Sequence, residues 1–134
     1  MRYPIAIEPG DAKHAYGVVV PDLPGCFSAG DSFDEAIVNA AEAIALWMED
    51  AIEHGGLPPA PVALEKHRNK REFKGWVWAM VDVDLSKIAD KAERINITLP
   101  SRLLSRVDAR AKRTGESRSG FLARAALEAL SHSR

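Results

Sequence analysis

Six carboxylates near the amino terminus are the side chains of this sequence that could support metal-dependent chemistry. They are Glu8, Asp11, Asp22, Asp31, Asp34 and Glu35. Nucleases that use two metal ions hold those ions with clustered carboxylates. Asp22 and Asp31 fall in predicted loops, and Asp34 and Glu35 belong to the first turn of a predicted helix, where acids favour the helix dipole. We therefore predict no catalytic residue and no enzymatic activity, with a magnesium-dependent nuclease as the alternative.

The single cysteine, Cys26, is the other candidate for covalent chemistry. No histidine stands at a recognisable spacing from it, and a cysteine after Pro-Gly at a strand start is usually a small buried residue. One cysteine allows no internal disulfide, and the histidines lie too far apart in the sequence for metal-ligand spacing. Those histidines are His14, His54, His67 and His132. We predict no cofactor and no metal site.

A third set of polar side chains could read DNA. Polar and apolar residues alternate in the stretch RINITL, residues 94–99, as they do in a strand with one wet face and one apolar face. One six-residue strand cannot satisfy its own ladder hydrogen bonds, so it needs a second copy of the chain. The predicted dimerisation residues are Ile95, Ile97 and Leu99, and the predicted base-contacting residues are Arg94, Asn96 and Thr98. The alternative is an edge strand of the front sheet with solvated polar residues.

Two short helices are predicted after this strand. Apolar residues recur at helical spacing over 101–113, the Thr114 to Ser117 turn interrupts them, and a second helix repeats the spacing. Amide groups at the start of that helix could hold a DNA phosphate, and the predicted phosphate-contacting residues are Ser117, Arg118 and Ser119. A two-stranded ribbon fits the major groove, where Arg, Asn and Thr match base edges. Residues 94–130 closely resemble the ribbon-helix-helix repressor fold.

The front of the chain predicts a small α+β domain. Strands are expected over 2–8 and 14–21, followed by a short strand near 26–29 and by a strand over 75–84. Ser32 and Glu35 form a capping box for a long helix that ends at Gly55 and Gly56. Between this helix and the last strand lies a proline-rich and charged connection, whose basic run over 66–74 is expected to be a solvated loop, with nucleic-acid contact as the alternative.

Charge is distributed unevenly along the chain. Of its 134 residues, the first 90 hold 8 Lys or Arg against 15 Asp or Glu, a net charge of −7, and residues 91–134 hold 10 against 4, a net charge of +6. A basic block next to an acidic one suggests a polyanion as the partner of the basic block. No signal peptide and no membrane-length apolar run is present, so we expect a cytoplasmic protein without a membrane partner.

The front segment also resembles a known family. The stretch from Tyr16 to Ile44 is similar to the amino-terminal domain of the HicB family of antitoxins. The matching residues are Pro21, Asp22, Pro24, Gly25, Cys26, Gly30, Asp31, Ser32, Glu35 and Ala36. Many family members carry a helix-turn-helix in place of a ribbon-helix-helix tail. The resemblance implies a partial ribonuclease H-like domain that binds and blocks a HicA-like toxin, an RNA-cleaving protein, in a complex that represses its own operon.

These inferences combine into one predicted organisation. Residues 1–85 form a toxin-binding domain, 86–93 a linker, and 94–134 a ribbon-helix-helix domain that binds operator DNA as a homodimer, with a tetramer as a further assembly. The candidate toxin-contacting residues are Trp76, Trp78 and Met80, for which core packing is the favoured alternative. The alternative function is a repressor without a toxin, whose front domain senses a ligand or drives oligomerisation.

Overall fold

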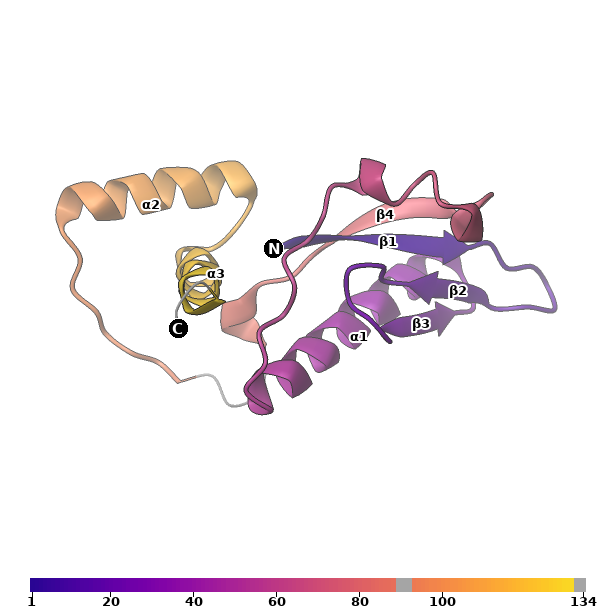
Figure 1. Ribbon diagram of the computed structural model, residues 1–134, viewed down its shortest axis with the longest axis horizontal. Coiled ribbons are helices and arrows are strands. Elements are labelled where there is room, and N and C mark those ends of the chain that lie inside the picture. Colours follow the sequence, from indigo (N-terminus) through magenta and orange to yellow (C-terminus); the bar gives the residue numbers. More distant parts are fainter. Residues whose placement is uncertain (89–92, 132–134) are drawn as a thin grey trace. The chain divides into compact units, whose positions relative to one another are not determined.

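The computed structural model describes residues 1–88 and 93–131, and Figure 1 shows their course. The chain divides into two compact units, one from Arg2 to Val83 and one that comprises Met1 and the chain from Asp84 onward. Residues 89–92 of the predicted linker and 132–134 of the predicted carboxy-terminal domain lie outside the described residues. The boundaries 1–85, 86–93 and 94–134 therefore stay a prediction.

The front unit contains a four-stranded antiparallel sheet. Its strands are β1 (Arg2–Glu8), β2 (Tyr16–Val19), β3 (Phe27–Gly30) and β4 (Val77–Asp82), arranged in the order β3-β2-β1-β4. The α+β prediction is confirmed. The second and fourth strands are shorter than predicted, because Asp11 and His14 close the β1–β2 turn with a backbone hydrogen bond, and Gly75 adopts a positive φ just before β4.

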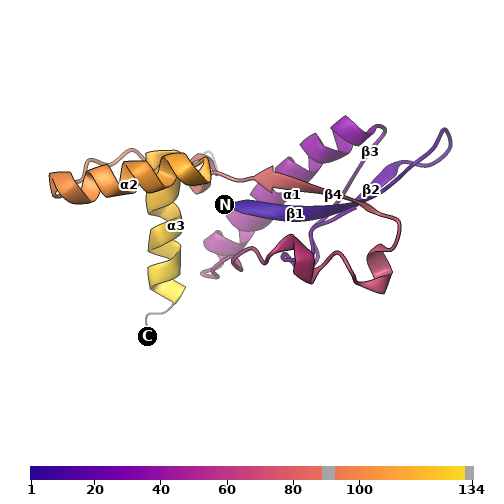
Figure 2. The same cartoon turned by 90° about the horizontal axis from the view of Figure 1, so that it is seen from above.

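Strand β1 lies at the centre of this unit and is buried on both faces. Because side chains alternate along a strand, Ile5 and Ile7 share one face, while Ala6, paired with Trp78, lies on the other. Helix α1 covers one side of the sheet and the connection between α1 and β4 covers the other (Figure 2). The apolar residues of β1 therefore hold the two outer layers together.

Helix α1 (Phe33–Glu53) begins at the predicted cap, where the Glu35 amide donates to the Ser32 hydroxyl. It ends just before Gly55, whose positive φ suits the left-handed turn that follows. The residues it buries against the sheet are Ala36, Ala40, Ile44 and Met48. No helix among the described residues is long and apolar enough to cross a membrane.

The connection from α1 to β4 is more ordered than a solvated loop. Most of its basic run is exposed, as expected, but His67 and Phe73 are buried. Phe73 packs edge-on against Trp76 and Trp78, and the His67 ring stacks on Trp78. This packing fits the favoured alternative for the tryptophans, in which they belong to the core.

The second unit consists mainly of two helices, α2 (Ser101–Thr114) and α3 (Arg118–Ser131). The short 3₁₀ helix η3 (Leu85–Lys87) packs on α3. Gly115 ends α2 with a positive φ, and the Glu116 amide donates to the Ala111 carbonyl, as in a Schellman motif. The predicted helix, turn and helix are therefore present.

The close approach of β3 to α1 gives a test of the fold. A β-carbon at Gly30 would lie 2.4 Å from the Ala36 amide nitrogen, whereas one at Gly17 would meet nothing closer than 3.8 Å. Gly30→Ala should therefore lower the free energy of unfolding by about 1 to 3 kcal/mol in a urea titration, because backbone must move apart. Gly17→Ala is the matched control on the neighbouring strand, and equal stability of the two variants would contradict this packing.

Candidate nucleic-acid interface

The predicted ribbon segment is extended and exposed in the single chain. Among the described residues, 93–100 belong to no helix and to no paired strand. Ile95 is 71% exposed and Ile97 57% exposed, whereas Leu99 is partly buried. Large aliphatic side chains left this open on alternate positions are typical of a segment that another apolar surface could cover. The pairing itself stays a prediction, because it requires a second chain.

The polar residues of this segment occupy the alternate positions. Arg94, Asn96 and Thr98 are all exposed, as base-contacting residues must be before DNA binds. Once two such segments pair, the period of two places all three on one face of the ribbon.

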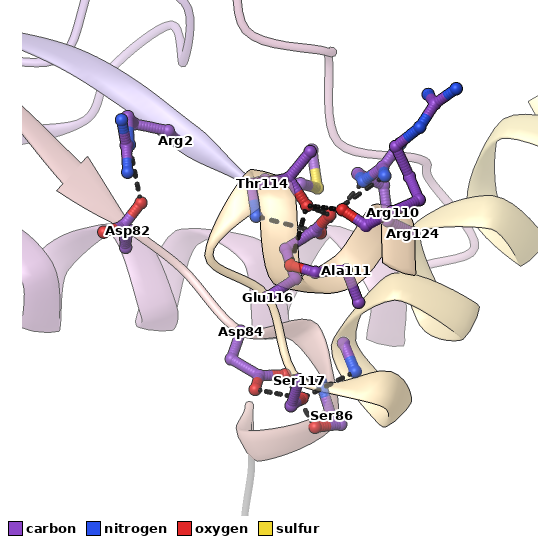
Figure 3. Close-up of polar contacts among 12 residues, drawn as sticks. Arg2, Asp82, Asp84, Ser86, Arg110, Ala111, Thr114, Glu116, Ser117 and Arg124 are labelled. Atoms are coloured by element: carbon purple, nitrogen blue, oxygen red, sulfur yellow. Dashed lines mark hydrogen bonds and ion pairs between the residues drawn. The ribbon is translucent and has the colours of Figure 1, made fainter. Parts of the chain in front are cut away.

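Ser117, the first of the predicted phosphate-contacting residues at the start of α3, already has partners within the second unit (Figure 3). Ser117 caps the helix, since the Gly120 amide donates to its hydroxyl oxygen at 2.9 Å. The same hydroxyl donates to Asp84 Oδ2 at 2.7 Å. The other oxygen of Asp84 accepts from the Ser86 amide and hydroxyl, at 2.9 and 2.6 Å. A carboxylate from η3 therefore lies at the amino end of α3.

The electrostatics of Asp84 follow from these contacts. Partial burial raises its pKa, but the hydrogen bonds from Ser86 and Ser117 outweigh that effect, and the pKa is lowered overall. The carboxylate is therefore ionised at neutral pH. Sequence reasoning missed this residue, because its partner is 33 positions away and only an Asp-x-Ser pattern with Ser86 signals a local turn.

Arg118 and Ser119, the other two predicted phosphate contacts, differ in their surroundings. Both nitrogen donors of the Arg118 fork reach Asp108 on α2 at 2.8 Å, which lowers the pKa of Asp108. The pair is exposed, so solvent screens it and its contribution to stability is small. Ser119 is exposed on the first turn of α3.

A second ion-pair network fixes the turn between the two helices. Glu116 accepts two hydrogen bonds from Arg124 at 2.9 Å, and the Thr114 hydroxyl donates to it at 2.7 Å. Arg124 also binds the exposed Glu128 and lies over the Phe121 ring. The hydrogen bonds from Arg124 lower the pKa of Glu116 from its ordinary 4.5 to about 2. This network orients α3 relative to α2.

The front unit brings none of its candidate catalytic groups together. No group of three or more His, Cys, Asp or Glu side chains with metal-binding geometry occurs within residues 1–88 and 93–131. Cys26 is buried, and burial raises the pKa of its thiol, which disfavours the reactive thiolate. Asp22, which is buried, accepts from His67 Nε2 at 2.8 Å and from the Val62 amide at 3.1 Å. That contact ties the connection to the β2–β3 loop.

Comparison with known proteins agrees with this architecture. Residues 3–126 match the model of the HicB-like antitoxins of bacterial toxin-antitoxin systems. The chain belongs to the HicB-like antitoxin family. The Burkholderia pseudomallei antitoxin HicB has 46% sequence identity to this chain. Its crystal structure matches with a TM-score of 0.77 and covers 97% of this chain and 98% of that one. The resemblance stated from the sequence is confirmed, and this antitoxin is not an enzyme.

Two further relatives resemble the antitoxin over different parts of its length. A 14.9 kDa protein of Haemophilus phage HP1, from its rep-hol intergenic region, is 46% identical over 108 residues, which are 81% of this chain and 80% of the relative. A structure of the HicA3 and HicB3 toxin-antitoxin complex contains a chain 30% identical, with a TM-score of 0.55 over 63% of this chain and 99% of that one. That homologue therefore binds a HicA toxin.

The Glu116 network predicts a pH-dependent contribution to stability. A carboxylate whose pKa is lowered on folding stabilises the folded state above its ordinary pKa of 4.5, and this contribution is lost as the pH falls through about 2. Glu116→Gln should therefore lower the free energy of unfolding by about 2 to 3 kcal/mol at pH 7. This is less than the full shift gives at about 1.4 kcal/mol per pKa unit, because solvent screens part of the interaction. Urea titrations between pH 7 and 2 measure the difference, which should shrink below pH 4.5.

Glu128→Gln is the matched control, because Glu128 binds the same arginine from an exposed position. It should cost less than about 0.5 kcal/mol at every pH. A Glu116→Gln deficit that persists unchanged at pH 2 would show that the carboxylate charge is not what matters.

Proposed function

We propose that this antitoxin binds and neutralises a HicA-like toxin that cleaves mRNA, and that it represses its own operon by binding operator DNA. The observation that carries the proposal is the match to a HicB antitoxin over 97% of the chain at 46% identity. The complex of the homologue HicB3 with HicA3 supports the toxin as partner. The charge division supports two binding activities, with −7 over residues 1–90 and +6 over 91–134.

The toxin would bind the acidic front unit. An RNA-binding toxin needs a basic surface, and complementary charge speeds encounter and orients the partners. Helix α1 carries six acidic residues and no basic one. On the same helix, Val38 and Leu46 are exposed large apolar side chains, which can supply the desolvated contacts that hold a partner.

The earlier candidates for toxin contact now differ from one another. Trp78 and Trp76 pack against Phe73, so their ring contacts are largely within the front unit. Met80 is the exposed member of the set, at 44%, and it lies on β4, an edge strand of the sheet. We propose Met80 as a toxin-contacting residue in addition to the exposed apolar residues of α1.

The basic second unit would bind DNA. Two copies of residues 94–99 would pair antiparallel, bury Ile95 and Ile97, and insert Asn96 and its polar neighbours into the major groove. Pairing of such dimers through the front units would give a tetramer, and both activities place the protein in the cytoplasm.

The alternative is a repressor without a toxin partner. The exposure of Ile95 and Ile97 favours a DNA-binding dimer. Both the antitoxin and the repressor without a toxin would need such a dimer, so this exposure does not distinguish the two functions. The family match favours the antitoxin.

Toxin neutralisation is the first test. The product of the adjacent reading frame, co-expressed with this chain, should co-purify with it at a fixed ratio and should cleave RNA only after the antitoxin is removed. A stoichiometric excess of the full chain should then stop the cleavage, as followed on a labelled RNA by gel electrophoresis. Uninhibited cleavage together with tight operator binding would establish the alternative, a repressor without a toxin.

The ribbon is tested with two neighbouring substitutions. Ile97→Lys should abolish both dimerisation, measured by sedimentation at micromolar concentration, and operator binding. Asn96→Ala should leave the dimer intact and weaken operator binding by about 1 to 3 kcal/mol, with relaxed base preference at one position. Fluorescence anisotropy with operator and scrambled duplexes measures both effects.

Arg118→Ala is the comparison for sequence-independent contact. It should weaken operator and scrambled DNA about equally and flatten the salt dependence of binding. Operator affinity that is unchanged in Asn96→Ala would remove the ribbon as the reading element.

A further inference from the structure

The amino end of α3 holds an internal anion where the proposed function requires an external one. Asp84 accepts the Ser117 hydroxyl proton at 2.7 Å, and Ser117 is both the cap of α3 and a predicted phosphate contact. The amino terminus of a helix binds anions through its free amides and its dipole. A carboxylate seated there occupies the Ser117 hydroxyl, one of the donors that a DNA phosphate would use.

The carboxylate of Asp84 lies close to the first turn of α3, beside Ser117 (Figure 3). A β-carbon at Gly120 would lie 2.6 Å from Asp84 Oδ1 and 3.1 Å from Ser117 Oγ. Glycine inside a helix is less favourable than alanine by about 1 kcal/mol, so its presence in the first turn calls for a compensating gain. Here it leaves space for an anion against the helix, and Asp84 occupies that space.

The rest of the Asp84 contacts come from its own turn. Ser86 donates twice to Oδ1, through its amide and its hydroxyl, so η3 presents the carboxylate in a fixed orientation. The charged groups around this end of α3 include Lys87 of η3 and Arg118, which is paired with Asp108. The Ser86 amide and hydroxyl and the Ser117 hydroxyl donate the hydrogen bonds to Asp84, and Lys87 adds a smaller coulombic attraction.

We propose that Asp84 is an autoinhibitory phosphate mimic, which must leave the amino end of α3 before that end can bind a DNA phosphate. This inference rests on the proposed DNA-binding function. Molecules in which Asp84 is bound to Ser117 then cannot contact a phosphate at this site. The measured DNA affinity is therefore the intrinsic affinity multiplied by the fraction of molecules in which Asp84 is released. Because phosphate contacts carry no base information, release of Asp84 raises affinity for all sequences alike.

The experiment compares three full-length variants by fluorescence anisotropy. The probes are a labelled duplex from the region upstream of the gene and a scrambled duplex of equal length. Asp84→Asn removes the anion, and Ser86→Ala loosens its orientation without any change of charge. We expect Asp84→Asn to tighten binding of both duplexes about tenfold and Ser86→Ala about threefold, with the ratio between the duplexes unchanged.

Asp82→Asn is the matched control. It removes the same charge two residues earlier, where the carboxylate pairs with Arg2 on β1 and not with α3. Its DNA affinity should stay within about twofold of the wild type. Equal tightening in Asp82→Asn and Asp84→Asn, with no effect of Ser86→Ala, would reduce the effect to general charge and overturn the proposal.

Two other outcomes are equally informative. Weaker binding by Asp84→Asn and Ser86→Ala, with melting temperatures near that of the wild type, would make Asp84 a support of the DNA-binding form and would overturn the proposal. If the wild type binds neither duplex and the variants do not either, the proposed DNA-binding function fails and the inference fails with it. If the wild type binds DNA and the variants bind it with the same affinity, the inference about Asp84 fails while the proposed DNA-binding function stands.

Discussion

An extended segment with its apolar side chains open to water is the constraint on which the proposed DNA-binding activity of the second unit depends. Residues 94–99 expose Ile95 and Ile97 and pair with no strand among the described residues. Isolated extended segments gain too little from local contacts to offset the conformational entropy of ordering them. A second copy supplies both the hydrogen bonds and the apolar surface in one step. In the proposed function the second unit would therefore couple its assembly to its recognition of DNA, because the same segment would carry the dimer contacts and the base-contacting side chains.

The front unit buries its apolar residues with elements of the same chain. Strand β1 is covered on both sides, and the connection after α1 is held by the His67–Trp78 stack and by the buried Asp22–His67 contact. Its outer surface is then free to be acidic. Acids near the carboxyl end of α1, such as Glu49 and Asp50, oppose the helix dipole. The helix carries no Lys or Arg to offset them, and the exposed His54 ring, 3.3 Å from Asp50, does so only when it is protonated. A basic partner would relieve this electrostatic cost, which is a physical reason to place the toxin there.

The elements that could be predicted from the sequence are those whose signals are local. The Ser32 cap, the helix that follows, the Thr114 to Ser117 turn and the burial of Cys26 all follow from patterns within a few residues. The Asp84–Ser117 and Asp22–His67 contacts join residues 33 and 45 positions apart. No periodicity or spacing encodes such contacts. His67 looked like part of a solvated basic run, since only the tertiary fold reveals that Asp22 and Trp78 enclose its ring.

Asp84 is placed where the two halves of the function meet in the chain. It follows β4 of the acidic unit by two residues and accepts a hydrogen bond from Ser117, the cap of the helix turn that would face DNA. Its carboxylate and a phosphate compete for one set of donors, so the free energy of seating Asp84 is subtracted from that of binding DNA. Whatever alters the conformation of residues 82–86 alters that difference. A ligand of the front unit can change DNA affinity only if it binds the form with Asp84 seated and the form with Asp84 released with different affinity. Because β4 ends only two residues before Asp84, a ligand that shifts β4 could favour one of these two forms.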